Sequence, residues 1–202
     1  MTKHARPLAL CLLATAAVVT HAEPARAHFS LMAPSCASNQ DFLGNPQKAA
    51  PCGENLVETN AVTTFRPGQT IAITIKETVY HPGHYRVLLA PTRAQLPADP
   101  PVTAAGTPCG STVITQNPTP PLLADGLLVH TSQFPGDGTQ TMMVKLPDNM
   151  TCTNCVLQVV QFMSNHALNN PGGCFYHHCA TVTIKAPDDG GAGTPDLAGA
   201  TD

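Results

Sequence analysis

The sequence predicts an all-β protein, an immunoglobulin- or fibronectin-like antiparallel β-sandwich with long disulfide-tied loops. Three observations support this class. Only 11% of the residues are charged while 20 are prolines, a profile of strands and ordered loops. No segment shows sustained helical periodicity, and short apolar or alternating runs are separated by turn residues. Seven cysteines follow residue 27, enough for three bridges between loops.

Residues 1–27 have the pattern of a cleavable secretory signal. Basic Lys3 and Arg6 precede an apolar stretch at 8–19, and the segment ends in the small-x-small sequence Ala-Arg-Ala. The apolar stretch is shorter than the roughly 20 residues of a membrane span. We therefore expect a secreted or periplasmic protein that begins at His28, with no membrane span in the mature chain. An uncleaved anchor is the alternative.

The 175 residues after this cleavage site fit one domain, at 28–185. They carry seven basic and twelve acidic residues, a net charge of −5 that argues against nucleic-acid binding, which needs a basic face. Residues 186–202 are rich in Gly, Ala and Asp and lack apolar bulk. Such a segment cannot bury enough surface to offset its ordering entropy, so we expect a disordered tail.

The strand candidates follow one another along the domain. An extended segment at 28–34 leads into a loop with Cys, Gly and Pro that ends at Gly53. Residues 70–76 alternate apolar and polar side chains, the pattern of a half-buried strand, and 85–90 forms the next strand. Residues 91–126 contain many prolines and no sustained period, which indicates a long ordered excursion. Further strands are predicted at 126–130, 140–146, 156–163 and 180–185.

The cysteines of the mature chain form an odd-numbered set: Cys36, Cys52, Cys109, Cys152, Cys155, Cys174 and Cys179. In an oxidising compartment they predict up to three disulfides and leave one thiol unpaired or paired between chains. Cys152 and Cys155 have the CxxC spacing of a redox motif. Because no helix signal follows them and no βαβ pattern surrounds them, a structural bridge is favoured.

A histidine at the mature N-terminus offers two nitrogen ligands to one metal ion. The α-amine and Nδ1 of His28 close a chelate ring, and a second imidazole completes a planar set of three nitrogens that suits Cu(II). With ordinary pKa values of about 8 and about 6.5, both groups can release a proton to copper near neutral pH. Zinc also accepts imidazole, but it explains the terminal position of His28 less well.

Short motifs follow the predicted cleavage site in a fixed order: His28-Phe-Ser-Leu, Pro51-Cys-Gly, His81-Pro-Gly-His-Tyr, Cys152-Thr-Asn-Cys and Phe175-Tyr-His-His-Cys-Ala. In this order they resemble the lytic polysaccharide monooxygenases and the copper-binding proteins related to them. The resemblance spans nearly all of residues 28–185. Its most specific parts are the terminal histidine and the Tyr-x-x-Cys-Ala segment.

This resemblance implies a mononuclear copper site of the histidine-brace type. His28 would give the amine and Nδ1, His81 would give the third nitrogen, and Tyr176 would lie near the axial position of the copper. His84 is a rival for His81, because the HxxH spacing lets either ring turn inward. The internal histidine of the family typically precedes a glycine two residues on, as His81 precedes Gly83, and this favours His81.

Other histidines have open roles. His177 and His178 are neighbours on a predicted strand and should face opposite sides of the sheet. Either could join Cys174 or His166 in an additional metal site, although solvated or hydrogen-bonded histidines are favoured. By the resemblance, His166 could also be a proton donor to bound oxygen species.

The sequence departs from the family pattern beside the axial tyrosine. Many members have a glutamine or glutamate near this tyrosine, but two positions before Tyr176 the chain has Cys174. Gln158 or Gln161 could fill that role from the neighbouring strand. These alternatives stay open at the level of sequence.

Three functions are compatible with these features. The first is an oxidative enzyme, in which copper reduced by an external electron donor activates O₂ or H₂O₂ to cleave a polysaccharide. The second is a non-catalytic copper-binding or acquisition protein outside the cytosol, and the third is a sugar-binding module with an incidental His28. The chain has no Trp and three Tyr, so sugar binding would rest on Tyr80, Tyr85, Phe29 and polar groups. The scarcity of aromatic residues and the missing carboxamide near Tyr176 favour the copper-binding protein, whereas Tyr176 itself and the lack of Met-rich runs favour the enzyme.

Overall fold

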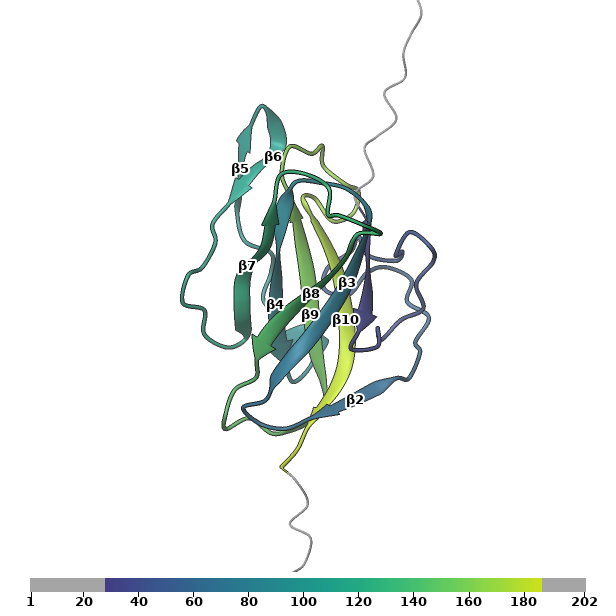
Figure 1. Ribbon diagram of the computed structural model, residues 1–202, viewed down its shortest axis with the longest axis vertical. Coiled ribbons are helices and arrows are strands. Elements are labelled where there is room, and N and C mark those ends of the chain that lie inside the picture. The colour runs from purple at the N-terminus through teal and green to yellow at the C-terminus, as the bar shows by residue number, and fades with distance from the viewer. Residues whose placement is uncertain (1–27, 187–202) are drawn as a thin grey trace, which may run out of the picture.

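The computed structural model describes residues 28–186, which form two β-sheets packed face to face (Figure 1). The predicted signal at 1–27 and all but the first residue of the tail predicted at 186–202 lie outside the described residues. The strands are β1 (His28–Ala33), β2 (Val62–Phe65), β3 (Thr70–Val79), β4 (Gly83–Ala90), β5 (Val102–Ala105), β6 (Thr107–Thr112), β7 (Leu122–His130), β8 (Thr139–Lys145), β9 (Cys152–Met163) and β10 (Phe175–Ile184).

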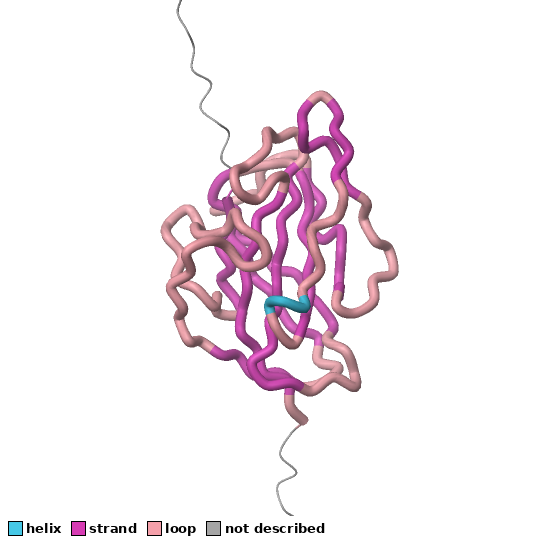
Figure 2. The backbone as a smooth tube through the Cα atoms, turned by 180° about the vertical axis from the view of Figure 1, so that it is seen from behind, coloured by secondary structure: helices cyan, strands magenta, loops and turns pink. Residues whose placement is uncertain are grey.

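The two sheets have the orders β1-β3-β8 and β2-β10-β9-β4-β7, and β5 and β6 form a separate hairpin. All ladders are antiparallel except that of β2 with β10, which is parallel. The predicted all-β sandwich is therefore confirmed. Figure 2 views the molecule from behind, where loops and one 3₁₀ turn (Arg93–Gln95) cover the larger sheet. Within residues 28–186 no helix is long and apolar enough to cross a membrane.

Three strands were not predicted: β2, β5 and β6. Their side chains are mostly exposed or half-buried, so they lack the alternation of apolar and polar residues that marks a strand with one buried face. The β5–β6 hairpin stands in the excursion expected at 91–126. It covers the outer face of the larger sheet, where Cys109 is fully buried with Val160 and Phe162.

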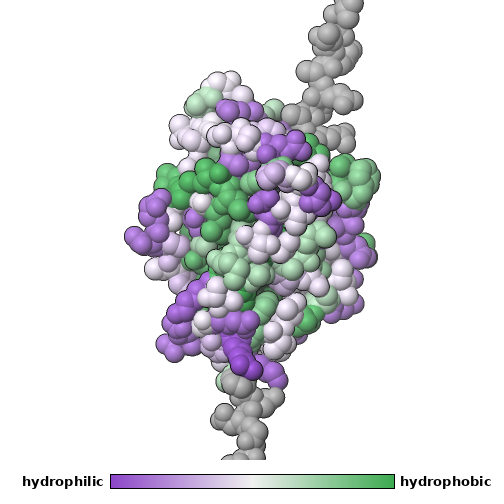
Figure 3. Space-filling model, in the orientation of Figure 1, coloured by the Kyte–Doolittle hydropathy of each residue, from purple (hydrophilic) through white to green (hydrophobic). Residues whose placement is uncertain are grey.

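The core lies between the sheets and follows from the period-two pattern of β3. Ile71, Ile73 and Ile75 occupy alternate positions and are buried, where they join Leu157 and Val182 from the larger sheet. The outward positions of the same strand are polar except for Ala72. Thr74 contacts Thr141 of β8 through their hydroxyls at 2.9 Å. Figure 3 views the molecule from this side and shows hydrophilic and hydrophobic residues interspersed.

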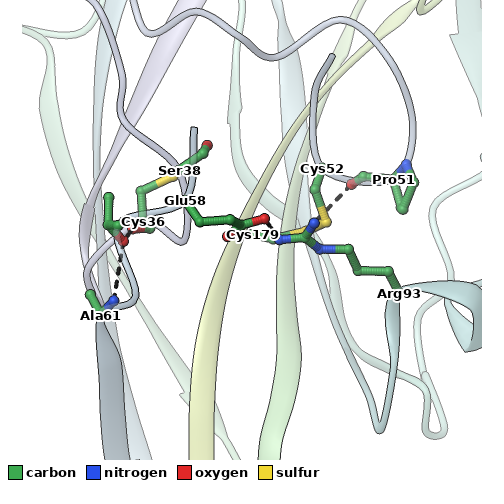
Figure 4. Close-up of polar contacts among 9 residues, drawn as sticks. Cys36, Ser38, Pro51, Cys52, Glu58, Ala61, Arg93 and Cys179 are labelled. Carbon is green, nitrogen blue, oxygen red and sulfur yellow. Dashed lines mark hydrogen bonds and ion pairs between the residues drawn. A yellow bond between two sulfur atoms is a disulfide. The ribbon is translucent and has the colours of Figure 1, made fainter. Parts of the chain in front are cut away.

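Three disulfides are present: Cys52–Cys179 and Cys109–Cys174 each tie a loop to a strand, and Cys152–Cys155 lies within β9. Among the described residues Cys36 is the free cysteine, and it is buried. The prediction of three bridges with one unpaired thiol is confirmed. Figure 4 shows the Cys52–Cys179 bridge beside an ion pair between Arg93 and Glu58, whose charged atoms lie 2.7 Å apart.

Candidate metal centre

The pairing of β1 with β3 brings His28 close to the connection that contains His81. His28 pairs with Val79 near the end of β3, and His81 follows Val79 by two residues. Both histidines are buried, with 2% and 7% of their surfaces exposed. Two residues that are far apart in the sequence therefore lie at the same end of the sandwich.

Tyr176 and His166 lie at the same end. The Tyr176 ring centre lies 5.3 Å from that of His28, and the Tyr176 hydroxyl donates to the side chain of Asn169 at 3.3 Å. The His166 ring meets the His81 ring edge-on, with centres 4.5 Å apart. The backbone N–H of Cys109 donates to the His166 carbonyl at 3.1 Å, so the hairpin supports the loop of His166.

The connection that carries His81 is fixed to the end of β9. The carbonyl of Pro82 accepts hydrogen bonds from both the backbone N–H and the hydroxyl of Ser164, at 2.8 and 3.0 Å. A Cβ atom at Gly83 would lie 1.9 Å from the carbonyl oxygen of Phe162. Only glycine allows β4 to begin this close to β9.

His84 faces a different environment from His81. Its ring lies against Phe162, with centres 5.3 Å apart, and its Nε2 lies 3.6 Å from the Asp125 carboxylate. Burial lowers the pKa of His84, while the Asp125 charge acts in the opposite direction. The structure therefore separates the two rivals: His81 contacts His166, and His84 contacts Asp125.

His177 and His178 point to opposite faces of β10. His177 Nε2 lies 2.9 Å from the Asp99 carboxylate. His178 Nε2 donates to the Phe29 carbonyl at 2.8 Å, and its Nδ1 lies 3.7 Å from the Cys36 sulfur. Burial, the largest cause, lowers the pKa of His178 to about 4, so this ring is neutral at pH 7.

Cys174 is bonded to Cys109, which removes it as a metal ligand. In the part of the chain that the structure describes, no group of three or more His, Cys, Asp or Glu side chains is placed to hold a metal ion. The predicted brace needs only two such side chains, those of His28 and His81, because its third nitrogen comes from the main-chain amine.

A row of three side chains crosses the larger sheet beneath this end. Tyr85, Gln161 and Tyr176 are direct register partners on β4, β9 and β10, so they share one face. Gln158 is an odd number of residues from Gln161 and lies on the other face, where it donates to the Pro51 carbonyl at 2.7 Å. Of the two glutamines, Gln161 is the one on the side of Tyr176.

Sequence reasoning missed Glu77, which is buried beside this row. Glu77 accepts a hydrogen bond from the Gln161 amide at 3.1 Å and forms an ion pair with His130 at 3.0 Å. The predicted strand ended at residue 76, three residues before the end of β3 at Val79. The alternation of Ile71, Ile73 and Ile75 continues to position 77. A carboxylate in this series of inward positions could have identified Glu77 as a functional candidate from the sequence.

The cluster shifts two acid–base equilibria. Burial lowers the pKa of His130, but hydrogen bonds with Glu77 and Leu128 and the Glu77 charge outweigh it, so the pKa is raised. Burial, followed by the charge of Glu77, raises the pKa of Tyr85 well above its ordinary value. Tyr85 therefore stays neutral, whereas the environment of His130 favours the cation.

The expectation that Phe29 and Tyr85 bind sugar is wrong. Both have 0% of their surface exposed, because β1 and β4 turn them into the core between the sheets. Tyr80 is half-buried. Among the aromatic side chains of residues 28–186, Phe42 is the most exposed, at 86%, and it was not singled out from the sequence.

Comparison with known proteins identifies a family. The model of one protein family, described as "Lytic polysaccharide mono-oxygenase, cellulose-degrading", matches residues 21–182. Among solved structures, a lytic polysaccharide monooxygenase AA15 from Thermobia domestica in the Cu(I) state is similar, with 19% sequence identity and a TM-score of 0.49. The match covers 78% of this chain and 98% of that chain. No curated protein matches.

Proposed function

Because the chain belongs to the family of cellulose-degrading lytic polysaccharide mono-oxygenases, we propose that it is a secreted copper-dependent enzyme that oxidatively cleaves a polysaccharide. In this proposal His28 and His81 bind one copper ion and Tyr176 lies beside it. The observation that carries the proposal is the β1–β3 ladder, which brings the predicted first residue of the mature chain to the connection that holds His81.

The residues present fit copper in the chemistry of their donor atoms. Two imidazoles and a phenol gather at one end of the sandwich, and removal of residues 1–27 would add the amine of His28 as a third nitrogen. Cu(II) prefers such nitrogen donors in a tetragonal arrangement. One-electron chemistry at O₂ or H₂O₂ would come from the copper, with electrons from an external donor.

In this proposal the side chains of the protein would orient the metal ligands and hold a proton beside them. His166 Nδ1 donates to the Ala167 carbonyl, so in the neutral ring Nε2 is the nitrogen that accepts a proton. Since this ring touches that of His81, a proton could be held beside the metal ligand at His166 Nε2. Tyr176 packs against His28 and is itself fixed by Asn169, which would restrict water on that side of the site.

Copper titration followed by EPR tests the ligand assignment. Mature protein with its N-terminus at His28, checked by mass, is expected to give a tight axial Cu(II) signal with nitrogen hyperfine structure. His81→Ala should weaken binding by more than the about 10- to 100-fold that follows loss of an outer-shell partner. His84→Ala is the matched control and should leave the signal unchanged. The opposite pattern would assign the ligand to His84.

A non-catalytic copper-binding protein is the second candidate, and the burial of Phe29 and Tyr85 favours it because both are lost as sugar contacts. Incubation of the copper-loaded protein with cellulose or chitin and a reductant separates the two. Oxidised oligosaccharides would support the enzyme. Tight copper binding without any oxidised sugar would support the copper-handling role.

Phe42 is the side chain expected to contact a polysaccharide surface. The Asp41 carboxylate accepts from the backbone N–H groups of Leu43 and Asn45, at 2.8 and 2.9 Å, which fixes the turn. The Thr78 hydroxyl donates to the Leu43 carbonyl at 2.7 Å, so this turn lies against the end of β3 that leads to His81. An exposed ring held rigidly beside the site is suited to stacking on a sugar.

Phe42→Ala is expected to weaken binding to insoluble cellulose by roughly tenfold, or about 1.4 kcal/mol. Binding isotherms of the metal-free protein measure the loss. Phe42→Tyr, which keeps a ring, should bind as the wild type does, and so should Val62→Ala, which removes an exposed side chain of β2. Equal affinity of Phe42→Ala and the wild type would exclude this contact.

A further inference from the structure

Glu77 is a buried carboxylate whose partners surround the site. Its side chain occupies an inward position of β3 and is 1% exposed. Oε1 lies 3.1 Å from the Gln161 amide nitrogen and 3.0 Å from His130 Nε2. The backbone N–H of His81 points to the same oxygen at 3.5 Å, a long hydrogen bond. One oxygen atom thus links β3, β7, β9 and the connection after β3.

His130 is fixed from several sides. Its Nδ1 donates to the Leu128 carbonyl at 2.8 Å, and the nearby backbone of His81 contributes to raising its pKa. The rings of Tyr80 and Phe134 lie 5.9 and 4.2 Å from its ring, measured between centres. Both members of the Glu77–His130 ion pair therefore lie beside the backbone of His81.

This cluster is poorly arranged for stability alone. Glu77 Oε2, Gln161 Oε1 and the Tyr85 hydroxyl are all buried without a hydrogen-bond partner among residues 28–186. A buried ion pair is often no better than apolar side chains of the same volume, and unsatisfied polar atoms make it worse. What the cluster does supply is a fixed set of contacts that converge on His81.

We propose that Glu77, together with His130, is a positioning residue that fixes the backbone of His81. Ser164 holds the next residue, Pro82, from the β9 side, so the connection is held on two sides. That His81 is a copper ligand rests on the proposed function. The fixing of the backbone does not, and it can be measured without copper.

Hydrogen exchange of the metal-free protein tests the backbone effect. Glu77→Gln removes the charge and keeps the size, and Glu77→Ala removes both. We expect peptides that cover residues 78–84 to exchange at least tenfold faster in both variants, while peptides from the centre of β9 stay unchanged. Glu58→Gln, which loses the exposed ion pair with Arg93, is the matched control and should exchange as the wild type does. Should Glu77→Ala not fold, Glu77→Gln alone decides.

Copper binding provides the second readout. If the wild type binds Cu(II), both Glu77 variants should bind about 10- to 100-fold more weakly and change the nitrogen hyperfine coupling, since outer partners orient metal ligands. Faster exchange at 78–84 in a protein that binds no copper would support the positioning role and reject the proposed function. Unchanged exchange at 78–84, or unchanged copper affinity and EPR spectrum in a copper-binding protein, would overturn the positioning role.

Discussion

One extra residue in front of His28 is expected to abolish tight copper binding although every side chain of the site remains. The extension converts the α-amine into a peptide amide, which has no basic lone pair, and it removes the chelate ring that the amine closes with Nδ1. We expect the dissociation constant for Cu(II) to rise by about 1,000-fold or more, which corresponds to about 4 kcal/mol. Competition with a chelator of known affinity measures the change.

The extension is a sharper test than His28→Ala. The His28 ring is buried and packs against Tyr176, so truncation would leave a cavity and disturb the neighbours of the copper. The extended and mature proteins should unfold at the same temperature without metal. Equal affinity in the two would show that the amine is not a ligand, and the imidazoles of His28, His81 and His166 would then be the donor set to examine.

The fold could be predicted from the sequence where one face of a strand is buried. The alternation at 70–76 located β3, and the observed strand adds residues 77–79 to it. The hairpin of β5 and β6 has no such pattern, because its strands cover the larger sheet from outside and stay half-exposed. Periodicity therefore located the strands that line the core and missed the two strands that cover the outer face of the larger sheet.

The grouping of His28, His81 and Tyr176 was implied by the family resemblance, and the three residues lie at one end of the sandwich. The separation of His81 from His84 was not decidable from spacing. It depends on Asp125 of β7, which is distant in sequence and lies beside His84. Tertiary contacts also bury the rings of Phe29 and Tyr85, which composition alone had suggested as sugar contacts.

Glu77 illustrates the same limit. Its residue type predicts an exposed position, and its place in the series of inward isoleucines predicts a buried one. The structure shows that the pattern prevails, since Gln161 and His130 supply the partners that a buried carboxylate needs. Such a conflict between residue type and pattern is itself a sign of a site, because it costs stability that an apolar residue would not.

Loss of the Cys52–Cys179 bridge is expected to cause the largest loss of stability. The bridge joins residues 127 positions apart, and the entropy of closing a loop of that length in the unfolded chain is worth about 5 kcal/mol. It attaches the loop before β2 to β10 (Figure 4), and the Pro51 carbonyl next to it accepts from Gln158 of β9. Urea unfolding of the Cys52→Ala/Cys179→Ala double variant measures the loss. The double variant is needed because a single change would leave a second free thiol in addition to that of Cys36.

The bridge between Cys152 and Cys155 is the matched control, because it closes a loop of only three positions. Its removal in Cys152→Ala/Cys155→Ala should cost about 2 kcal/mol on the same entropic scale. If the two double variants lose equal stability, loop closure is not the source of the effect, and contacts around each bridge would have to account for it. A larger loss for the long bridge would support loop closure in the unfolded chain as the source of the effect.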